Sequence, residues 1–128
     1  MKLLIVADVK GSEVRKPTLE LFSQARRLGL SADALLIGAG IARQADTLAG
    51  QGAGTVYLAE DASLAAFDPS RYLALTQDAV QQSGGTQVWF STSETSKALA
   101  PLLAARMEGG YISDALGLEL DGDVTTVT

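Results

Sequence analysis

The sequence predicts a three-layer α/β sandwich built on a mostly parallel, doubly wound sheet. Four short, mainly apolar runs, typical of strands buried on both faces, alternate with segments whose apolar residues recur at helical spacing. Because crossover connections between parallel strands are right-handed, this alternation gives a sheet with helices on both faces. The 128 residues correspond to a single α/β domain that is long enough to bury a hydrophobic core.

The first half of the chain predicts three of these strands and two helices. The strands are expected at residues 3–8, 32–37 and 55–58. Residues 9–16 form a polar connection. The first helix is expected over residues 17–28, because Pro17 suits a first helical turn and Gly29 suits the left-handed position after the last turn. The second helix is expected over residues 41–49.

The second half of the chain predicts two more helices around the fourth strand. Residues 62–68 form a short helix or a loop, and Pro69 opens a helix over residues 70–82. The fourth strand, at residues 88–90, leads into a helix over residues 97–107. The predicted strands and helices therefore alternate as far as residue 107.

Pro101 sets the expected start of the last helix. Proline has no N–H to donate and fits without loss only in a first turn, so the start is placed near Lys97. Thr95 or Ser96 would then cap the helix. The expected buried stripe of this helix consists of Leu99, Leu102, Leu103 and Met107.

The C-terminal residues predict an antiparallel hairpin at the edge of the sheet. Residues 116–120 and 124–128 read as strands on either side of a turn. The last run has neither the charge nor the proline that protects an exposed edge, which indicates a chain cut from a longer protein. The same edge predicts weak self-association of the isolated domain, because Leu116, Leu118 and Leu120 give the hairpin an apolar face.

Composition argues against several classes of function. A net charge of −5 and a pI near 4.5 provide no basic surface for nucleic acid. The sequence has no cysteine, which fits a reducing compartment, and no histidine, which removes the usual metal ligand and general base. The N-terminal apolar run ends after residue 7, far short of the roughly 20 residues of a membrane span. We therefore expect a soluble, cytoplasmic protein without membrane insertion.

The turn Gly38-Ala39-Gly40 matches part of a dinucleotide-binding fingerprint. Glu60 follows about 20 residues later, where that fingerprint has its ribose-binding acid. However, Arg43 stands where the third glycine is needed. A tight turn that enters a helix also explains both glycines. Gly38 and Gly40 are therefore candidates for an anion or nucleotide site, and the tight turn is the alternative explanation for both.

A hydroxyl-rich loop after the fourth strand gives a second candidate site. Ser91, Thr92 and Ser93 precede a helix N-terminus, whose N–H groups and positive dipole can hold a phosphate. The alternative is that these hydroxyls only cap the helix and satisfy the loop backbone. No catalytic residue is predicted, because no histidine can activate a serine and Lys97 is the only basic side chain near the loop. No metal site is predicted from the carboxylates at strand ends and turns, Asp8, Asp61, Asp68 and Asp114.

Several segments carry a resemblance to a known family. They lie at residues 4–7, 18–26, 36–40, 52–57 and 111–114, and the most specific is Leu-Ala-Pro-Leu-Leu-Ala-Ala-Arg at residues 99–106. On these segments the chain resembles, over essentially all of its length, the N-terminal domain of the electron transfer flavoprotein alpha subunit. It departs from that family at Ser91-Thr92-Ser93 and Ser96-Lys97, where the family usually has Gly-Ala-Thr and Gly-Arg.

The resemblance implies a Rossmann-like, adenine-nucleotide alpha-hydrolase-like domain of an FAD-containing heterodimer. The complete protein would pass electrons from flavin dehydrogenases, such as the acyl-CoA dehydrogenases of fatty acid beta-oxidation, to the respiratory chain. In this family FAD lies mainly in a C-terminal domain of the alpha subunit, and AMP, where present, in the beta subunit. Residues 1–128 would then bind no cofactor and would act as a scaffold that holds the beta subunit. The alternative is a free-standing adenine-nucleotide-binding module that resembles the universal stress proteins and uses the Gly38 turn and the Ser91 loop.

Overall fold

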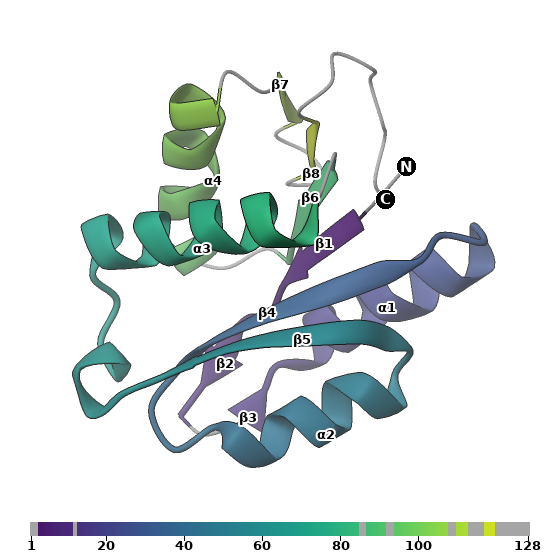
Figure 1. Ribbon diagram of the computed structural model, residues 1–128, viewed down its shortest axis with the longest axis horizontal. Helices are drawn as coiled ribbons and strands as arrows, with labels where there is room; N and C mark the ends of the chain where they lie inside the picture. The colour runs from purple at the N-terminus through teal and green to yellow at the C-terminus, as the bar shows by residue number, and fades with distance from the viewer. Residues whose placement is uncertain are drawn as a thin grey trace.

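A six-stranded sheet forms the centre of the described part of the protein, in the order β5, β4, β1, β6, β8, β7 (Figure 1). The structure, a computed structural model, describes residues 3–11, 13–84, 87–91, 94–107, 110–112 and 117–119. The parallel strands are β1 (Leu3–Val6), β4 (Ala32–Gly38), β5 (Ala53–Glu60) and β6 (Gln87–Phe90). The mostly parallel, doubly wound sheet is therefore confirmed, with β1 in its interior.

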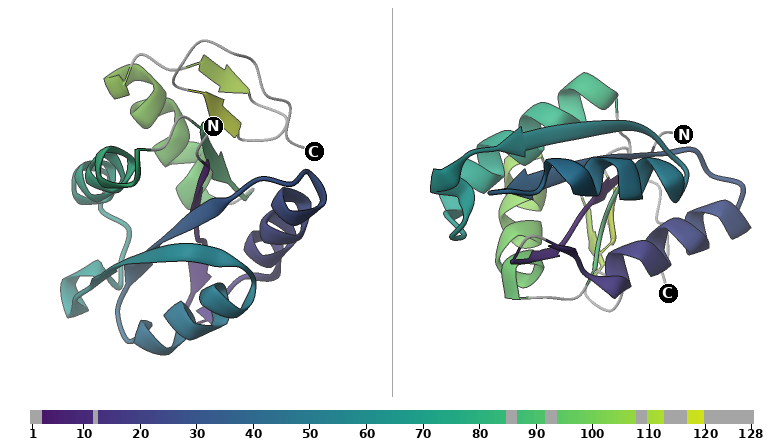
Figure 2. Two further views of the ribbon diagram at one scale, coloured as in Figure 1. Left: turned by 45° about the vertical axis from the view of Figure 1, so that its right-hand side comes forward. Right: turned by 90° about the horizontal axis from the view of Figure 1, so that it is seen from below.

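Alternate residues of β1 divide the hydrophobic core into two halves. The helices that cover the sheet are α1 (Lys16–Arg27), α2 (Ala42–Gly50), α3 (Pro69–Ser83) and α4 (Glu94–Met107). Leu3 and Ile5 pack in the half that contains buried residues of α1 and α2, whereas Leu4 and Val6 pack in the half that contains those of α3 and α4. The two pairs of helices lie on opposite faces of the sheet, which gives the predicted three layers (Figure 2).

Turn residues fix the ends of two helices close to where the sequence predicted them. Pro17 lies in the first turn of α1, and Gly29 follows that helix with a left-handed φ of 70°. Asp68 caps α3 by accepting hydrogen bonds from the Ser70 and Arg71 N–H groups at 3.1 and 3.3 Å. Gly84 ends α3 with a φ of 69°. These local signals are strong because each meets a backbone requirement of a helix end.

The connection after β1 contains more regular structure than the sequence predicted. β2 (Val9–Lys10) and β3 (Glu13–Val14) form a short antiparallel ribbon. Gly11 lies between them with a φ of 65°, the left-handed conformation that glycine adopts readily. The later connection at residues 62–68 contains a 3₁₀ turn, η1 (Ala62–Leu64), which agrees with the predicted short helix or loop.

The predicted start of α4 is wrong by three residues. The helix begins at Glu94, so Pro101 lies in its interior, and Thr95 and Ser96 are helical residues. A proline in a helix cannot donate to the carbonyl four residues earlier, here that of Lys97. Pro101 and Lys97 are both exposed, so this cost falls on the solvent side of the helix, while the opposite side packs in the core.

The predicted buried stripe of α4 is also partly wrong. Leu99 and Leu103 are buried as expected, with at most 1% of their surface exposed, but Leu102 is 41% exposed. Ala100, which was not part of the predicted stripe, is fully buried in the core. The side chain of Met107 lies outside the described part of the helix.

The antiparallel edge of the sheet is confirmed, but the pairing within it differs from the prediction. β8 (Gly117–Glu119) lies between β6 and β7 (Gly110–Ile112), and it is antiparallel to both. Both edges of β8 are thus paired with described strands, so residues 117–119 offer no free edge to the predicted hairpin partner at residues 124–128. The outer edge of β8 is paired with β7, a strand that was not predicted from the sequence. Residues 124–128 lie outside the described residues, and weak self-association stays a prediction.

Candidate functional site

The order in which the chain adds parallel strands to the sheet reverses at β1, and the carboxyl ends of these strands lie along one edge there. From β1 the chain passes through α1 to β4 on one side, and it later returns through α3 to β6 on the other side of β1. Open α/β sheets commonly bind ligands at such a switch point. A ligand of this fold is therefore expected near the carboxyl end of β1.

A cavity of about 360 Å³ lies at the carboxyl ends of β1 and β4. Its volume is within the usual range for small-molecule pockets. Polar and apolar atoms contribute about equally to its described wall, and the polar side chains among the lining residues are those of Asp8, Tyr72 and Thr95. The described residues that line it are Val6, Ala7, Asp8, Val9, Gly11, Ile37, Gly38, Ala39, Leu64, Ala65, Phe67, Tyr72, Thr95 and Leu99.

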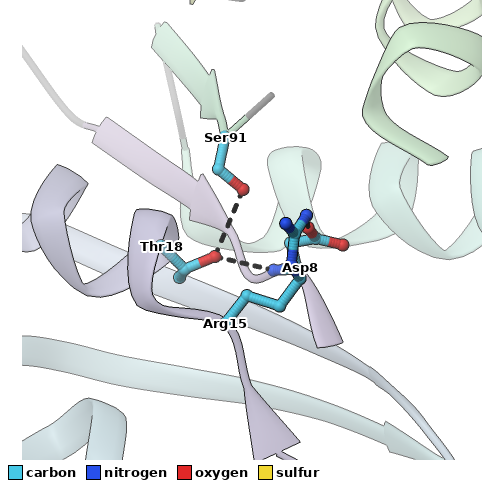
Figure 3. A network of polar contacts seen from close by, with 4 residues as sticks. All are labelled: Asp8, Arg15, Thr18 and Ser91. Atoms are coloured by element: carbon cyan, nitrogen blue, oxygen red, sulfur yellow. Dashed lines mark hydrogen bonds and ion pairs between the residues drawn. The ribbon is translucent and has the colours of Figure 1, made fainter. Parts of the chain in front are cut away.

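A buried group of polar contacts joins three elements beside this cavity (Figure 3). The backbone N–H of Asp8 donates to Thr18 Oγ1 at 2.9 Å, and the hydroxyl oxygens of Thr18 and Ser91 lie 3.4 Å apart. Thr18 is fully buried, and Asp8 and Ser91 are nearly so. Because Thr18 lies in the first turn of α1, these contacts tie the start of that helix to the ends of β1 and β6.

Arg15 neutralises the buried carboxylate of Asp8. Its Nη1 lies 2.7 Å from Asp8 Oδ2, and its backbone N–H donates to the Asp8 carbonyl oxygen at 2.8 Å. These two bonds close the base of the β2–β3 ribbon. On β3, the Val14 N–H donates to Gln44 Oε1 of α2 at 3.1 Å. The two contacts between Arg15 and Asp8 therefore tie the ribbon to the end of β1.

The Gly38-Ala39-Gly40 turn leads into α2, and the chain itself supplies an anion at the start of this helix. Glu60 Oε2 accepts hydrogen bonds from the Ile41 and Ala42 N–H groups, both at 2.8 Å. Gly40 has a left-handed φ of 66°, and a Cβ at Gly38 would approach the Ile41 side chain to 3.3 Å. Backbone conformation and close packing thus explain both glycines. The Glu60 carboxylate thus occupies two of the N–H groups that could otherwise bind a phosphate at this helix N-terminus.

Two aromatic side chains form part of the cavity wall. The rings of Phe67 and Tyr72 meet edge to face with their centroids 5.0 Å apart. The Tyr72 hydroxyl donates to the Leu64 carbonyl oxygen at 2.7 Å. Burial raises the pKa of Tyr72, and the nearby Arg71 cation opposes this in part. The phenol therefore stays neutral and anchors the η1 turn to α3.

The described candidate residues are not gathered into one anion-binding cradle. Gly38 lines the cavity, whereas Gly40 is exposed in the turn and Ser91 is directed to Thr18 (Figure 3). Thr92 and Ser93 lie outside the described residues. An anion-binding role for these five residues stays a prediction.

Sequence reasoning missed the contacts of Asp8, Arg15 and Thr18. The sequence identifies Asp8 only as a carboxylate at a strand end, whereas in the structure it is 8% exposed and paired with Arg15. A polar residue directly after a buried strand was the available signal. Its partners could not be identified, because their approach depends on the unpredicted ribbon that brings residue 15 back to residue 8.

Acidic residues in the other described turns serve local structure. Asp61 Oδ1 accepts from the Ser63 N–H at 2.8 Å, and the hydrogen bonds from Ser63 hold the pKa of Asp61 below its usual value. The described residues contain no group of three or more histidine, cysteine or acidic side chains placed to hold a metal ion. None of the helices in that part of the chain has the length and apolar composition to cross a membrane.

The fold and the site define a doubly wound α/β domain in which the chain's own side chains occupy key polar positions at the strand ends. Comparison with known proteins identifies the family. The family model for the electron transfer flavoprotein domain matches residues 3–128. The chain belongs to this family, and it corresponds to the N-terminal domain of the alpha subunit.

Curated relatives agree with this family. The electron transfer flavoprotein subunit alpha of Bacillus subtilis is 28% identical over 94% of this chain and 38% of the relative. That of Syntrophomonas wolfei is 27% identical over 91% of this chain and 37% of the relative. The LctC subunit of a lactate dehydrogenase (NAD(+),ferredoxin) from Acetobacterium woodii is 26% identical over 92% of this chain and 29% of the relative. The chain thus spans 38%, 37% and 29% of the length of these three relatives.

The family name implies a flavin, but the described residues do not fit the pyrophosphate of FAD at the α2 N-terminus. The two N–H groups there already bond to Glu60. The Ser91 hydroxyl, at the end of β6, lies against Thr18 inside the protein. Two of the backbone donors with which a Rossmann-like fold would bind a pyrophosphate at this helix are therefore already occupied.

Proposed function

We propose that residues 1–128 form a single structural domain of an electron transfer flavoprotein alpha subunit, which binds the beta subunit and leaves flavin binding to another region. The observation that carries this proposal is the family match from residue 3 to residue 128. The whole protein would be an electron carrier, and this domain would have no active site of its own.

The finer parts of the proposal follow from the family. FAD would be the redox group of the full-length, soluble and cytoplasmic protein. Flavin dehydrogenases, such as acyl-CoA dehydrogenases, would donate electrons, and the respiratory chain would accept them. The chain covers 38% of the Bacillus subtilis relative, so a flavin-binding region has room in a protein of that length.

The geometry of the strand ends supports a scaffold over the alternative nucleotide-binding module. That module needs the Gly38 turn and the Ser91 loop to present donors to a phosphate. Glu60 holds the first set of donors, and Ser91 contacts Thr18. The cavity of about 360 Å³ beside Gly38 is the one observation in favour of the alternative.

Calorimetric titration of the purified chain with AMP and with ATP separates the two functions. A scaffold domain gives no saturable binding up to about 1 mM, an affinity that corresponds to only about −4 kcal/mol. Stoichiometric binding of either nucleotide would contradict the scaffold proposal. A Gly38→Val variant, which narrows the turn at the cavity, would then show whether the nucleotide occupies this cavity.

A further inference from the structure

The cavity at the carboxyl ends of β1 and β4 is formed by elements of this domain. Its described walls come from the end of β1 and the ribbon after it, the end of β4, the η1 turn, the start of α3 and the first turns of α4. A cavity of about 150 Å³ already holds a benzene ring. The volume of about 360 Å³ therefore leaves room for a ring that carries a polar substituent.

The Asp8 carboxylate lines this cavity with one oxygen to which no described group donates. Oδ2 contacts Arg15 Nη1 at 2.7 Å, whereas Oδ1 points away from the guanidinium (Figure 3). The Asp8 N–H donates to Thr18 Oγ1, and the Asp8 carbonyl oxygen accepts from the Arg15 N–H, so the residue is held in position. Oδ1 is therefore a fixed acceptor that a hydrogen-bond donor in the cavity would satisfy.

The other two polar side chains of the wall leave this preference for donors unchanged. The Tyr72 hydroxyl donates its hydrogen to the Leu64 carbonyl oxygen at 2.7 Å, so its oxygen can only accept a further bond. The Thr95 hydroxyl can donate or accept. A ligand that matches the described wall must therefore bring at least one donor of its own.

The charges of the wall disfavour an anion. Asp8 is the only charged side chain among the described residues that line the cavity, and Arg15 balances its charge. At the neighbouring Gly38 turn, the Glu60 carboxylate occupies the Ile41 and Ala42 N–H groups. A phosphate or carboxylate would lose hydration here without gaining an unpaired cation. The matching ligand is therefore neutral or cationic.

The apolar part of the wall favours a ring. The rings of Phe67 and Tyr72 meet edge to face, with their centroids 5.0 Å apart, and both residues line the cavity. Leu64 and Leu99 add buried aliphatic side chains. A flat, apolar group can contact these side chains over its faces and edges.

We propose that this cavity binds a small ring-containing molecule that carries a hydroxyl or ammonium donor and no negative charge. The donor bonds to Asp8 Oδ1, and the ring packs against Phe67, Leu64 and Leu99. This inference does not rest on the proposed function. It is compatible with a scaffold domain that binds neither AMP, ATP nor FAD, because the phosphates of these molecules are anionic.

Three probes with the same ring and different charges test the proposal: benzyl alcohol, benzylamine and benzoate. Each is titrated into the isotope-labelled chain, and the backbone amide signals of Asp8, Gly11 and Gly38 are followed by NMR. Benzyl alcohol or benzylamine should give saturable shifts with a Kd of about 1–10 mM, the range expected for such small molecules. Benzoate should bind at least about tenfold more weakly. The first two probes distinguish a neutral donor from a cationic one.

Two neighbouring alanines provide a matched pair of variants that locates the site. Ala65 and Ala66 are both exposed, but only Ala65 is among the residues that line the cavity. Ala65→Leu adds volume to the wall and should weaken binding at least about tenfold, whereas Ala66→Leu should bind as the wild type does. Nuclear Overhauser contacts between the probe ring and Leu64 or Leu99 locate the site without any variant.

Asp8→Asn tests the acceptor. It removes the negative charge and should weaken benzylamine binding at least about tenfold, the effect of losing a hydrogen bond to a charged group. A purely structural role of Asp8 would lower stability but leave the preference for benzylamine over benzoate unchanged, and that result would overturn the role of Oδ1.

The remaining outcomes decide the proposal as a whole. Saturable shifts that Ala65→Leu reduces and Ala66→Leu retains support it. The absence of saturable shifts with all three probes would mean that the cavity holds only solvent, and would overturn it. Binding of benzoate as tight as that of benzyl alcohol and benzylamine would overturn the assigned class of ligand. Binding that both alanine variants retain, without contacts to Leu64 or Leu99, would place the probe elsewhere and overturn the assigned site.

Discussion

Helices α2 and α4 each follow a parallel strand at the same end of the sheet, but they differ in the residues that their outer faces expose to solvent. α2 buries Leu48, exposes its outer residues to solvent, and has its N-terminus bonded to Glu60. α4 buries one face and exposes a second apolar face. The two helices therefore differ in their exposed residues, which include polar side chains on α2 but are all apolar between positions 98 and 105 of α4.

The strongest test of this comparison is the inner face of α4. Replacing Leu103, which is fully buried, by alanine should destabilise the domain by about 2–5 kcal/mol, because it removes core contacts and leaves a cavity. Chemical denaturation measures the change. A loss below about 0.5 kcal/mol, as expected for a surface position, would show that this face is not core.

The polar contacts of Thr18 at the ends of β1 and β6 should have the next largest effect. Thr18→Val keeps the shape of the side chain but removes the acceptor of the Asp8 N–H, which is buried. An unsatisfied buried N–H should cost about 1–3 kcal/mol of unfolding free energy. Thr18→Ser retains the hydroxyl and serves as the control. Equal stability of the valine variant and the wild type would mean that water or another group satisfies Asp8.

The cap of α2 should have a smaller effect than Thr18. Glu60→Ala removes the acceptor from the Ile41 and Ala42 N–H groups and should cost about 1 kcal/mol, the usual value of a helix N-cap. Glu20→Ala, an exposed glutamate in α1, should stay within about 0.5 kcal/mol of the wild type. If both variants unfold at the same denaturant concentration, Glu60 does not stabilise α2.

The outer face of α4 should have the smallest effect of all on the isolated domain. Leu102→Ala should change the free energy of unfolding by no more than about 0.5 kcal/mol, because Leu102 is exposed and alanine favours a helix. Denaturation of this variant beside Leu103→Ala compares the two faces directly. A loss as large as that of Leu103→Ala would show that the domain already buries Leu102.

Most of the fold could be predicted because its signals are local. Gly29 and Gly84 have the left-handed conformations that helix ends require, and Asp68 caps α3. The start of α4 could not be predicted in this way. The penalty of an internal proline is only a few kcal/mol, and the packing of Leu99 and Leu103 on an otherwise regular helix can exceed it.

The candidate site was less predictable because its contacts join distant segments. The glycine turn and Glu60 were identified from spacing, but only the fold shows that the carboxylate bonds to the turn that the glycines form. The hydroxyl of Ser91 was placed correctly at a strand end. Its orientation toward Thr18 depends on the packing of α1 against β6.

Titration of the purified 128-residue chain with FAD tests the central claim most directly. If this domain is a scaffold that leaves flavin binding to another region, the visible spectrum and the fluorescence of FAD stay unchanged at equimolar and excess protein, as they do with an unrelated protein of equal concentration. Tight, stoichiometric quenching of the flavin fluorescence would place a cofactor site within residues 1–128 and contradict the account.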